Sequence, residues 1–182
     1  MFVFGQNIGN GSDDNHFQVG FTSVKLINRM TEFKQGVFHI DATYKIVKNC
    51  FPLIVLGFTD LSRKFFPVAF MFTSHEETRD YDYFFHEFKS LCRRLGIDFD
   101  PSHMVSDACH ASFNAISRHF PSCCILVCWF HLKQNIRKHK SKIPVKRYRK
   151  TMKEIDELHR CGCHGSYQLS KNYHKKNRRV KL

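Results

Sequence analysis

The stretch that most constrains the fold runs from Gly36 to Lys45 (GVFHIDATYK), where a short apolar run ends at a carboxylate. Val37 to Ile40 is β-branched and aromatic and follows a glycine, a pattern typical of a strand buried on both faces. Asp41 comes directly after it. An ionised group at the end of a buried strand costs free energy unless a partner compensates the charge, and a divalent cation is the simplest partner. We therefore predict that Asp41 belongs to a nuclease-type metal site.

A second carboxylate, Asp107, ends another short apolar run, Met104 to Ser106, and each of the two acids is followed by alanine. If these strands are parallel neighbours, both carboxylates emerge at the same end of the sheet. Carboxylate oxygens suit Mg²⁺ or Mn²⁺, and a pair of such ions supports phosphoryl transfer. An alternative stays open for either residue alone, because aspartate also forms turns and caps helices. It is strongest for Asp107, which precedes a predicted helix.

The hydrophobic pattern predicts an α/β fold with a mixed sheet, three antiparallel strands followed by two parallel strands with crossover helices. The strands are expected at 37–41, 51–58, 65–72, 104–107 and 123–129, and the helices at 22–33, 76–95, 108–119, 130–139 and 146–159. Pro67 indicates a bulge or an edge position in its strand. Ser74 with Glu77 is expected to cap the second helix, and Gly96 to end it. Residues 5–20 are expected to form a loop, and the chain from Arg160 onward to be disordered.

Charge is distributed unevenly along the 182 residues. Residues 1–131 carry 12 Lys+Arg against 13 Asp+Glu, a net −1, whereas residues 132–182 carry 17 against 3, a net +14. Such a basic segment indicates a polyanionic partner, of which nucleic acid is the commonest, and DNA is the partner we expect. A solvated tail that binds nothing is the alternative.

The N-terminal sequence and the cysteines indicate the cellular compartment in which the protein is expected. The N-terminus does not resemble a signal peptide, and no apolar run approaches the roughly 20 residues of a membrane span, so no membrane partner is expected. Most of the eight cysteines lie in apolar stretches, where a free thiol packs as a small hydrophobic group, which favours a reducing compartment. We expect the protein in the nucleus, or in nucleus and cytoplasm.

A basic tract between residues 133 and 153 is the expected DNA-binding surface, with affinity that falls as salt rises. It carries no signature for reading bases. Its candidate DNA-binding residues are Lys133, Arg137, Lys138, Lys140, Lys142, Lys146, Arg147, Arg149 and Lys150.

Cys128 and His131 form a second candidate metal site, because a spacing of three at a strand-to-helix turn lets both side chains reach one ion. Zinc needs two further ligands, and Cys161, Cys163 and His164 are available in the sequence. The alternative is structural, a packed cysteine and a histidine that caps the helix.

The quoted segments, in their order along residues 33–142, resemble the catalytic core of Mutator-like element (MULE) transposases. The segments that carry the likeness are HIDATYK, LIVLGFTD, FPVAFMFTSHEET, VSDACHASFNAI and CWFHLKQNIRK. The resemblance implies an RNase H-like fold and a DDE-type, metal-dependent DNA strand transferase. It further implies that Asp41 and Asp107 are the first two catalytic acids, and that Cys128 and His131 are the C-x₂-H element that opens a helical insertion.

The resemblance also implies a third acid, a glutamate after the insertion, which we do not find; Glu154 and Glu157 fall too early to be assigned. We therefore expect a fold that is incomplete at the C-terminus. The predicted segments are a lead-in with a short helix (1–32), the RNase H-like core (33–142), and a basic helical and disordered tail that begins a truncated insertion (143–182).

Three functional hypotheses follow. The first is a transposase-derived domain that is inactive because its third acid is missing. The second is a DNA-binding or regulatory protein derived from a transposable element. The third is an active transposase whose last acid is supplied by Glu154, by Glu157 or by another chain, for instance another copy in a homo-oligomer.

Overall fold

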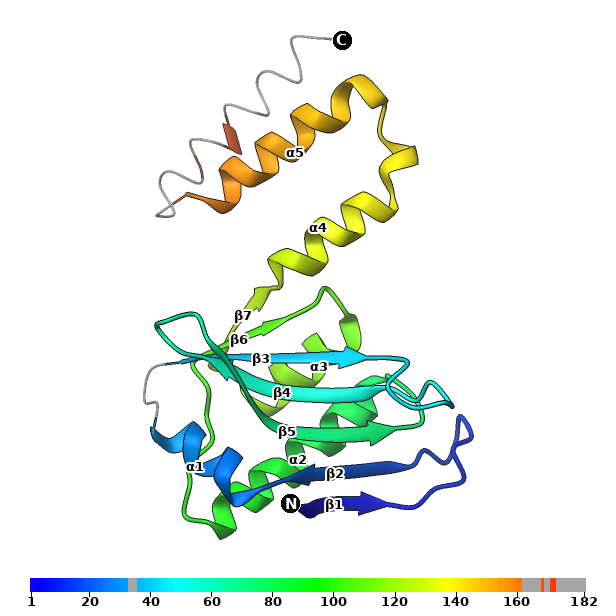
Figure 1. Cartoon of the computed structure of the whole chain (residues 1–182), viewed down its shortest axis with the longest axis vertical. Coiled ribbons are helices and arrows are strands. Elements are labelled where there is room, and N and C mark those ends of the chain that lie inside the picture. The colour runs from blue at the N-terminus through cyan, green and yellow to red at the C-terminus, as the bar shows by residue number, and fades with distance from the viewer. Residues whose placement is uncertain (33–35, 162–167, 169–170, 173–182) are drawn as a thin grey trace. The chain divides into compact units, whose positions relative to one another are not determined.

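A mixed sheet of seven strands organises the computed structural model, which describes residues 1–32, 36–161, 168, 171 and 172 (Figure 1). In spatial order the strands run β1-β2-β5-β4-β3-β6-β7. Neighbours are antiparallel from β1 to β3, and β3, β6 and β7 are parallel. The strands are β1 (Phe2–Asn7), β2 (Gln18–Thr22), β3 (Val37–Thr43), β4 (Leu53–Thr59), β5 (Phe65–Thr73), β6 (His103–Ser106) and β7 (Cys124–Val127).

Helices connect the strands and cover one face of the sheet. In Figure 1, α2 and α3 lie behind the strands. The described helices are α1 (Val24–Glu32), α2 (Thr78–Arg94), α3 (His110–His119), α4 (Trp129–Lys138), the short 3₁₀ helix η1 (Lys140–Lys142) and α5 (Val145–His159). None of the helices in the described part of the chain is both long and apolar enough to cross a membrane.

The hydrophobic core lies between the sheet and these helices. Ile54, Leu56 and Phe58 of β4 are buried there together with Phe84, Phe85 and Phe88 of α2. This apolar stripe of α2 is the one that its sequence period predicts. Leu95, the last residue of the helix expected at 76–95, is exposed because it lies past the end of α2.

Most of the expected elements are confirmed. The antiparallel strands β3, β4 and β5 and the parallel pair β6-β7 form as predicted, and β6 lies parallel beside β3, which was the condition for the two acids to emerge at one sheet end. The register between β4 and β5 shifts next to Pro67, so the bulge prediction is right, and β5 is an internal strand. Gly96 adopts a positive φ just beyond α2, as a helix-ending glycine does.

Three local predictions are wrong. Residues 5–20 are not one loop, because β1 and β2 form at its ends and pair into the sheet beside β5. The residue that precedes α2 is Glu77, whose backbone N–H donates to Asp80 at 2.9 Å, so Ser74 is not the cap. In β3 only Ile40 is fully buried, since helices pack on one face of this strand.

The described chain divides into two compact units, residues 1–132 and 133–182. The second contains α5 and most of α4. Within it Lys133 pairs with Asp156 at 3.1 Å, and the Lys140 ammonium lies 5.2 Å from the centre of the Tyr148 ring. The predicted disorder after Arg160 falls almost entirely outside the described residues, and the predicted segment boundaries at 32 and 142 remain predictions.

Candidate active site

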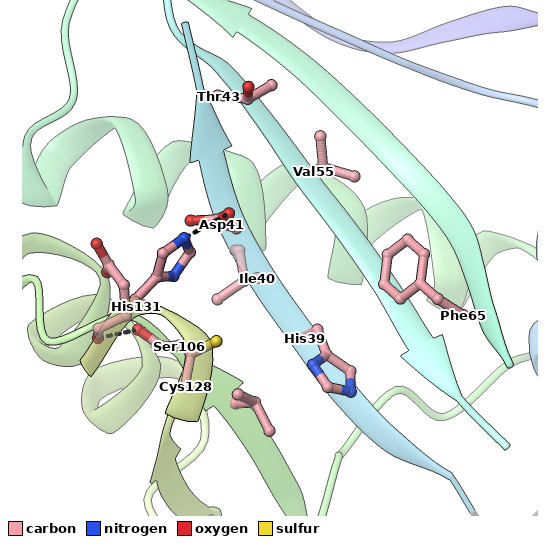
Figure 2. A pocket seen from close by; sticks show the side chains of 11 residues that line it. His39, Ile40, Asp41, Thr43, Val55, Phe65, Ser106, Cys128 and His131 are labelled. Carbon is pink, nitrogen blue, oxygen red and sulfur yellow. Dashed lines mark hydrogen bonds and ion pairs between the residues drawn. The ribbon is translucent and has the colours of Figure 1, made fainter. Parts of the chain in front are cut away.

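Two adjacent strands bring the two predicted acids together. The parallel register of β3 and β6 pairs Ile40 with Ser106, so Asp41 and Asp107 are the next residues at the same end of neighbouring strands. Both line a pocket of about 320 Å³, which they share with Cys128 and His131. Figure 2 shows Asp41 on β3 facing the His131 ring. The arrangement expected from the sequence, two carboxylates at one sheet end, is the one that forms.

Asp41 is half-buried, with 48% of its side chain exposed. Burial raises the pKa of its carboxyl above the ordinary value. The nearby His131 opposes that shift, the negative charges of Asp107 and Glu76 add to it, and the backbone N–H of Ala42 opposes it. The ionised form of Asp41 is therefore destabilised by its surroundings, and a cation in the pocket would relieve the repulsion between its carboxylate and Asp107.

Asp107 holds the start of the turn into α3. Its Oδ1 accepts a hydrogen bond from the backbone N–H of Cys109 at 3.1 Å. Asp107 therefore does form a turn through this oxygen, as the alternative to metal binding predicted. It does not compete with a site role, because the side chain also lines the pocket and its charge reaches Asp41.

His131, at the start of α4, faces Asp41 through Nε2, with a distance of 3.7 Å to Oδ2. Its other ring nitrogen, Nδ1, is buried and has no hydrogen-bond partner among the described residues. Cys128 lines the same pocket. The C-x₂-H pair therefore lies beside the two acids rather than at a separate place.

A zinc site at Cys128 and His131 stays a prediction. Cys163 and His164 lie outside the described residues, and Cys161 belongs to the other compact unit. Among the residues that the structure describes, no three His, Cys, Asp or Glu side chains are grouped so that they could hold a metal ion.

Glu76 is a site residue that sequence reasoning missed. It follows β5, and its charge reaches Asp41. Tyr81 donates its hydroxyl to Glu76 Oε1 at 2.8 Å, and Tyr44 donates to Oε2. Burial and the Glu76 carboxylate raise the pKa of both phenols, which keeps them protonated as donors. The available signal was another acid just past the end of an apolar strand, the pattern that identified Asp41.

The basic tract is largely exposed where its side chains are described. Arg137 and Lys138 of α4 and Arg147, Arg149 and Lys150 of α5 are exposed, as are Lys140 and Lys142 between the helices. Lys133 is half-buried and paired with Asp156, so it is the least available cation of the set. The side chain of Lys146 lies outside the described part. The exposed cations could contact phosphates.

Comparison with known protein families gives one finding. A family model described as the MULE transposase domain matches residues 37–135, which span β3 through most of α4 and include Asp41, Asp107, Cys128 and His131. No curated protein matches the chain.

Proposed function

The chain belongs to the MULE transposase family, and from this membership we propose that it is a transposase-derived, DNA-binding protein with an RNase H-like core. The sheet supports the proposal, because three antiparallel strands are extended by two parallel ones joined through α3. A transposase domain implies interaction with DNA, and we propose the nucleus as its location.

The observation that carries the proposal is that Asp41 and Asp107 follow the last paired residues of two neighbouring parallel strands and line one pocket. Two carboxylates on one pocket, with the pKa of Asp41 raised in part by Asp107, fit a hard divalent cation. Mg²⁺ takes one or two carboxylates and keeps several waters, so this donor set suits Mg²⁺ or Mn²⁺. When bound, such an ion activates the attacking oxygen and stabilises the leaving oxygen in phosphoryl transfer.

Neighbouring groups would position the Asp41 and Asp107 carboxylates for binding a cation. His131 holds the Asp41 carboxylate at the pocket, and the Cys109 N–H fixes one oxygen of Asp107. Tyr44 and Tyr81 orient the Glu76 carboxylate, whose charge adds to the attraction for cations. Within the described residues no third ligand joins the two aspartates, so we propose that the chain binds DNA and cation but does not complete strand transfer.

Cation binding is tested by thermal unfolding with Mg²⁺ or Mn²⁺. A ligand that binds the folded state raises the melting temperature, and we expect this for the wild type but not for Asp41→Asn or Asp107→Asn. Asp98→Asn, an exposed acid elsewhere, is the matched control. An equal rise in all four proteins would mean that the ion binds somewhere else.

Catalysis is tested with labelled DNA and Mn²⁺. We expect binding without cleavage. Cleavage that disappears in Asp41→Asn would overturn the inactive assignment and favour the hypothesis of an active transposase whose last acid comes from elsewhere, for example from a second copy of the chain.

A DNA-binding or regulatory role without any cation is the second candidate. The exposed cations of α4 and α5 favour it, because they can bind phosphates independently of the acid pair. It predicts that Asp41→Asn and Asp107→Asn leave DNA affinity unchanged.

A further inference from the structure

An exposed phenylalanine ring packs closely against a glycine of the sheet. Phe65, the first residue of β5, is 48% exposed, yet its ring rests against β4 at Gly57. A Cβ at position 57 would stand 2.3 Å from Cζ and 2.5 Å from Cε2 of this ring. Glycine weakens the interior of a strand, but here the absence of a side chain at position 57 leaves the space that the Phe65 ring occupies.

The ring lies beside the candidate active site. Phe65 lines the same pocket as Asp41 and Asp107, and Figure 2 shows it across β4 from the β3 residues. The His39 ring stands edge-on to it, with 5.9 Å between ring centroids and 83° between the planes. A hydrogen bond of 2.7 Å to the Thr59 hydroxyl holds His39 in place.

Positive charge accompanies the ring. Arg63 and Lys64, in the turn directly before Phe65, are exposed. Aromatic rings and cations together are the features by which proteins bind single-stranded nucleic acid, with bases stacked on rings and phosphates near cations. Elsewhere on the sheet, Phe21 stacks with Phe70 and Phe72, whereas the Phe65 ring is half-exposed and lines the pocket.

We propose that Phe65, seated on Gly57 and flanked by His39, is a stacking platform for an unpaired nucleobase of the DNA strand that passes Asp41 and Asp107. The inference rests on the proposed function, since it takes DNA as the ligand. The base must be unpaired or in single-stranded DNA, because a base inside a duplex has neighbours on both faces. A second pocket, of about 610 Å³, shares His39 and Val105 with the first and offers room for an adjoining nucleotide.

The test uses the full chain and a single-stranded oligonucleotide of about ten nucleotides that carries 2-aminopurine, whose fluorescence is quenched by stacking. We expect wild type to change the fluorescence on binding. Phe65→Ala should remove this change and weaken binding roughly 10-fold, which is of the order of one lost base stack. Phe65→Trp should restore both. Phe113→Ala removes a ring of similar exposure, 51%, from α3 and should behave as wild type.

Melting temperatures show whether each variant is folded, and Phe65→Leu separates aromatic stacking from apolar contact. Unchanged fluorescence and affinity in Phe65→Ala, while wild type binds DNA, would overturn the platform alone. Leucine that works as well as phenylalanine would also overturn it, as would a change of oligomeric state in Phe65→Ala, which would mean that protein covers the ring. Wild type that binds neither single-stranded nor duplex DNA would overturn the proposed function as well.

Discussion

Asp41 sits where its own charge is unfavourable. Burial and two neighbouring carboxylates raise its pKa, and His131, which lowers it, does not cancel them. Groups kept in such positions at the expense of stability are frequent at functional sites. The stability of the protein should therefore improve when this charge is removed.

We predict that Asp41→Asn stabilises the cation-free protein at pH 7 by less than about 1 kcal/mol, since a half-exposed carboxylate is screened by solvent. The folded-state pKa is raised, so the destabilisation is present when Asp41 is ionised and disappears as the pH falls through that pKa toward the reference value of 3.8. Denaturant unfolding at pH 7 and near pH 4 checks this. A gain of the same size at both pH values would contradict it.

Asp80 has a structural role instead. It is fully buried, and its Oδ1 accepts hydrogen bonds at 2.8 Å from His16, Gln18 and Thr73. Through these bonds one carboxylate ties the approach to β2 and the end of β5 to α2. Removing it leaves several buried donors without a partner.

We expect Asp80→Ala to cost at least about 3 kcal/mol of unfolding free energy, the sum expected for several unsatisfied buried groups. Asp98→Ala, which removes an exposed acid, should stay within about 0.5 kcal/mol of wild type. Urea unfolding of the two variants measures the difference. Equal stability would mean that water replaces the carboxylate.

At the scale of elements, the N-terminal hairpin β1-β2 belongs to the folded core. The Phe4 ring of β1 is buried and meets Phe84 and Phe88 of α2 edge-on, at 5.8 and 5.7 Å between centroids. Gly20 of β2 leaves room for this ring, because a Cβ there would lie 2.6 Å from it. The hairpin therefore extends the sheet over the middle of α2.

We predict that Phe4→Ala destabilises the protein by about 3–5 kcal/mol, as for other large-to-small changes in a core. Val3→Ala is the matched control, since Val3 is the preceding residue of the same strand and is 52% exposed. Thermal unfolding of both variants measures the loss of stability, which should be large for Phe4→Ala and small for Val3→Ala if β1 is part of the core. A small effect of Phe4→Ala would mean that the hairpin is dispensable.

At the scale of the whole molecule, the acid pair and the cations belong to different compact units. Asp41 and Asp107 lie in residues 1–132, which are nearly neutral, whereas the basic tract lies in residues 133–182. Affinity for DNA and affinity for the cation should therefore respond to different substitutions.

We predict that changing Arg147, Arg149 and Lys150 to glutamine weakens duplex binding and lowers the slope of log K against log salt by about 0.9 for each lost phosphate contact. Changing Lys25, Arg93 and Arg94 of the first unit to glutamine keeps the net charge matched and should have a smaller effect. Deleting residues 143–182 should reproduce the loss. If affinity and slope survive the deletion, the tract is not the binding surface.

The sequence alone determined the local elements and the family. Short continuous apolar runs placed β3 to β7, and apolar residues three and four apart placed the helices, because both patterns are visible in a local stretch of sequence. The prediction from local pattern failed for β1 and β2, because Gly, Asn and Asp between residues 5 and 20 are typical of a loop. Strand formation there depends on pairing with β5, which lies about 50 residues away in sequence and is not visible locally.

The tertiary structure decided what each side chain faces. The sequence shows that Asp41 and Asp107 each end an apolar strand. Their adjacency follows from the parallel register of β3 and β6. The pairing of His131 with Asp41, the approach of Glu76 and the seating of Phe65 on Gly57 join residues that are far apart along the chain. Such contacts arise from packing of separate elements, and so the chemistry of the pocket is fixed by the fold rather than by any one motif.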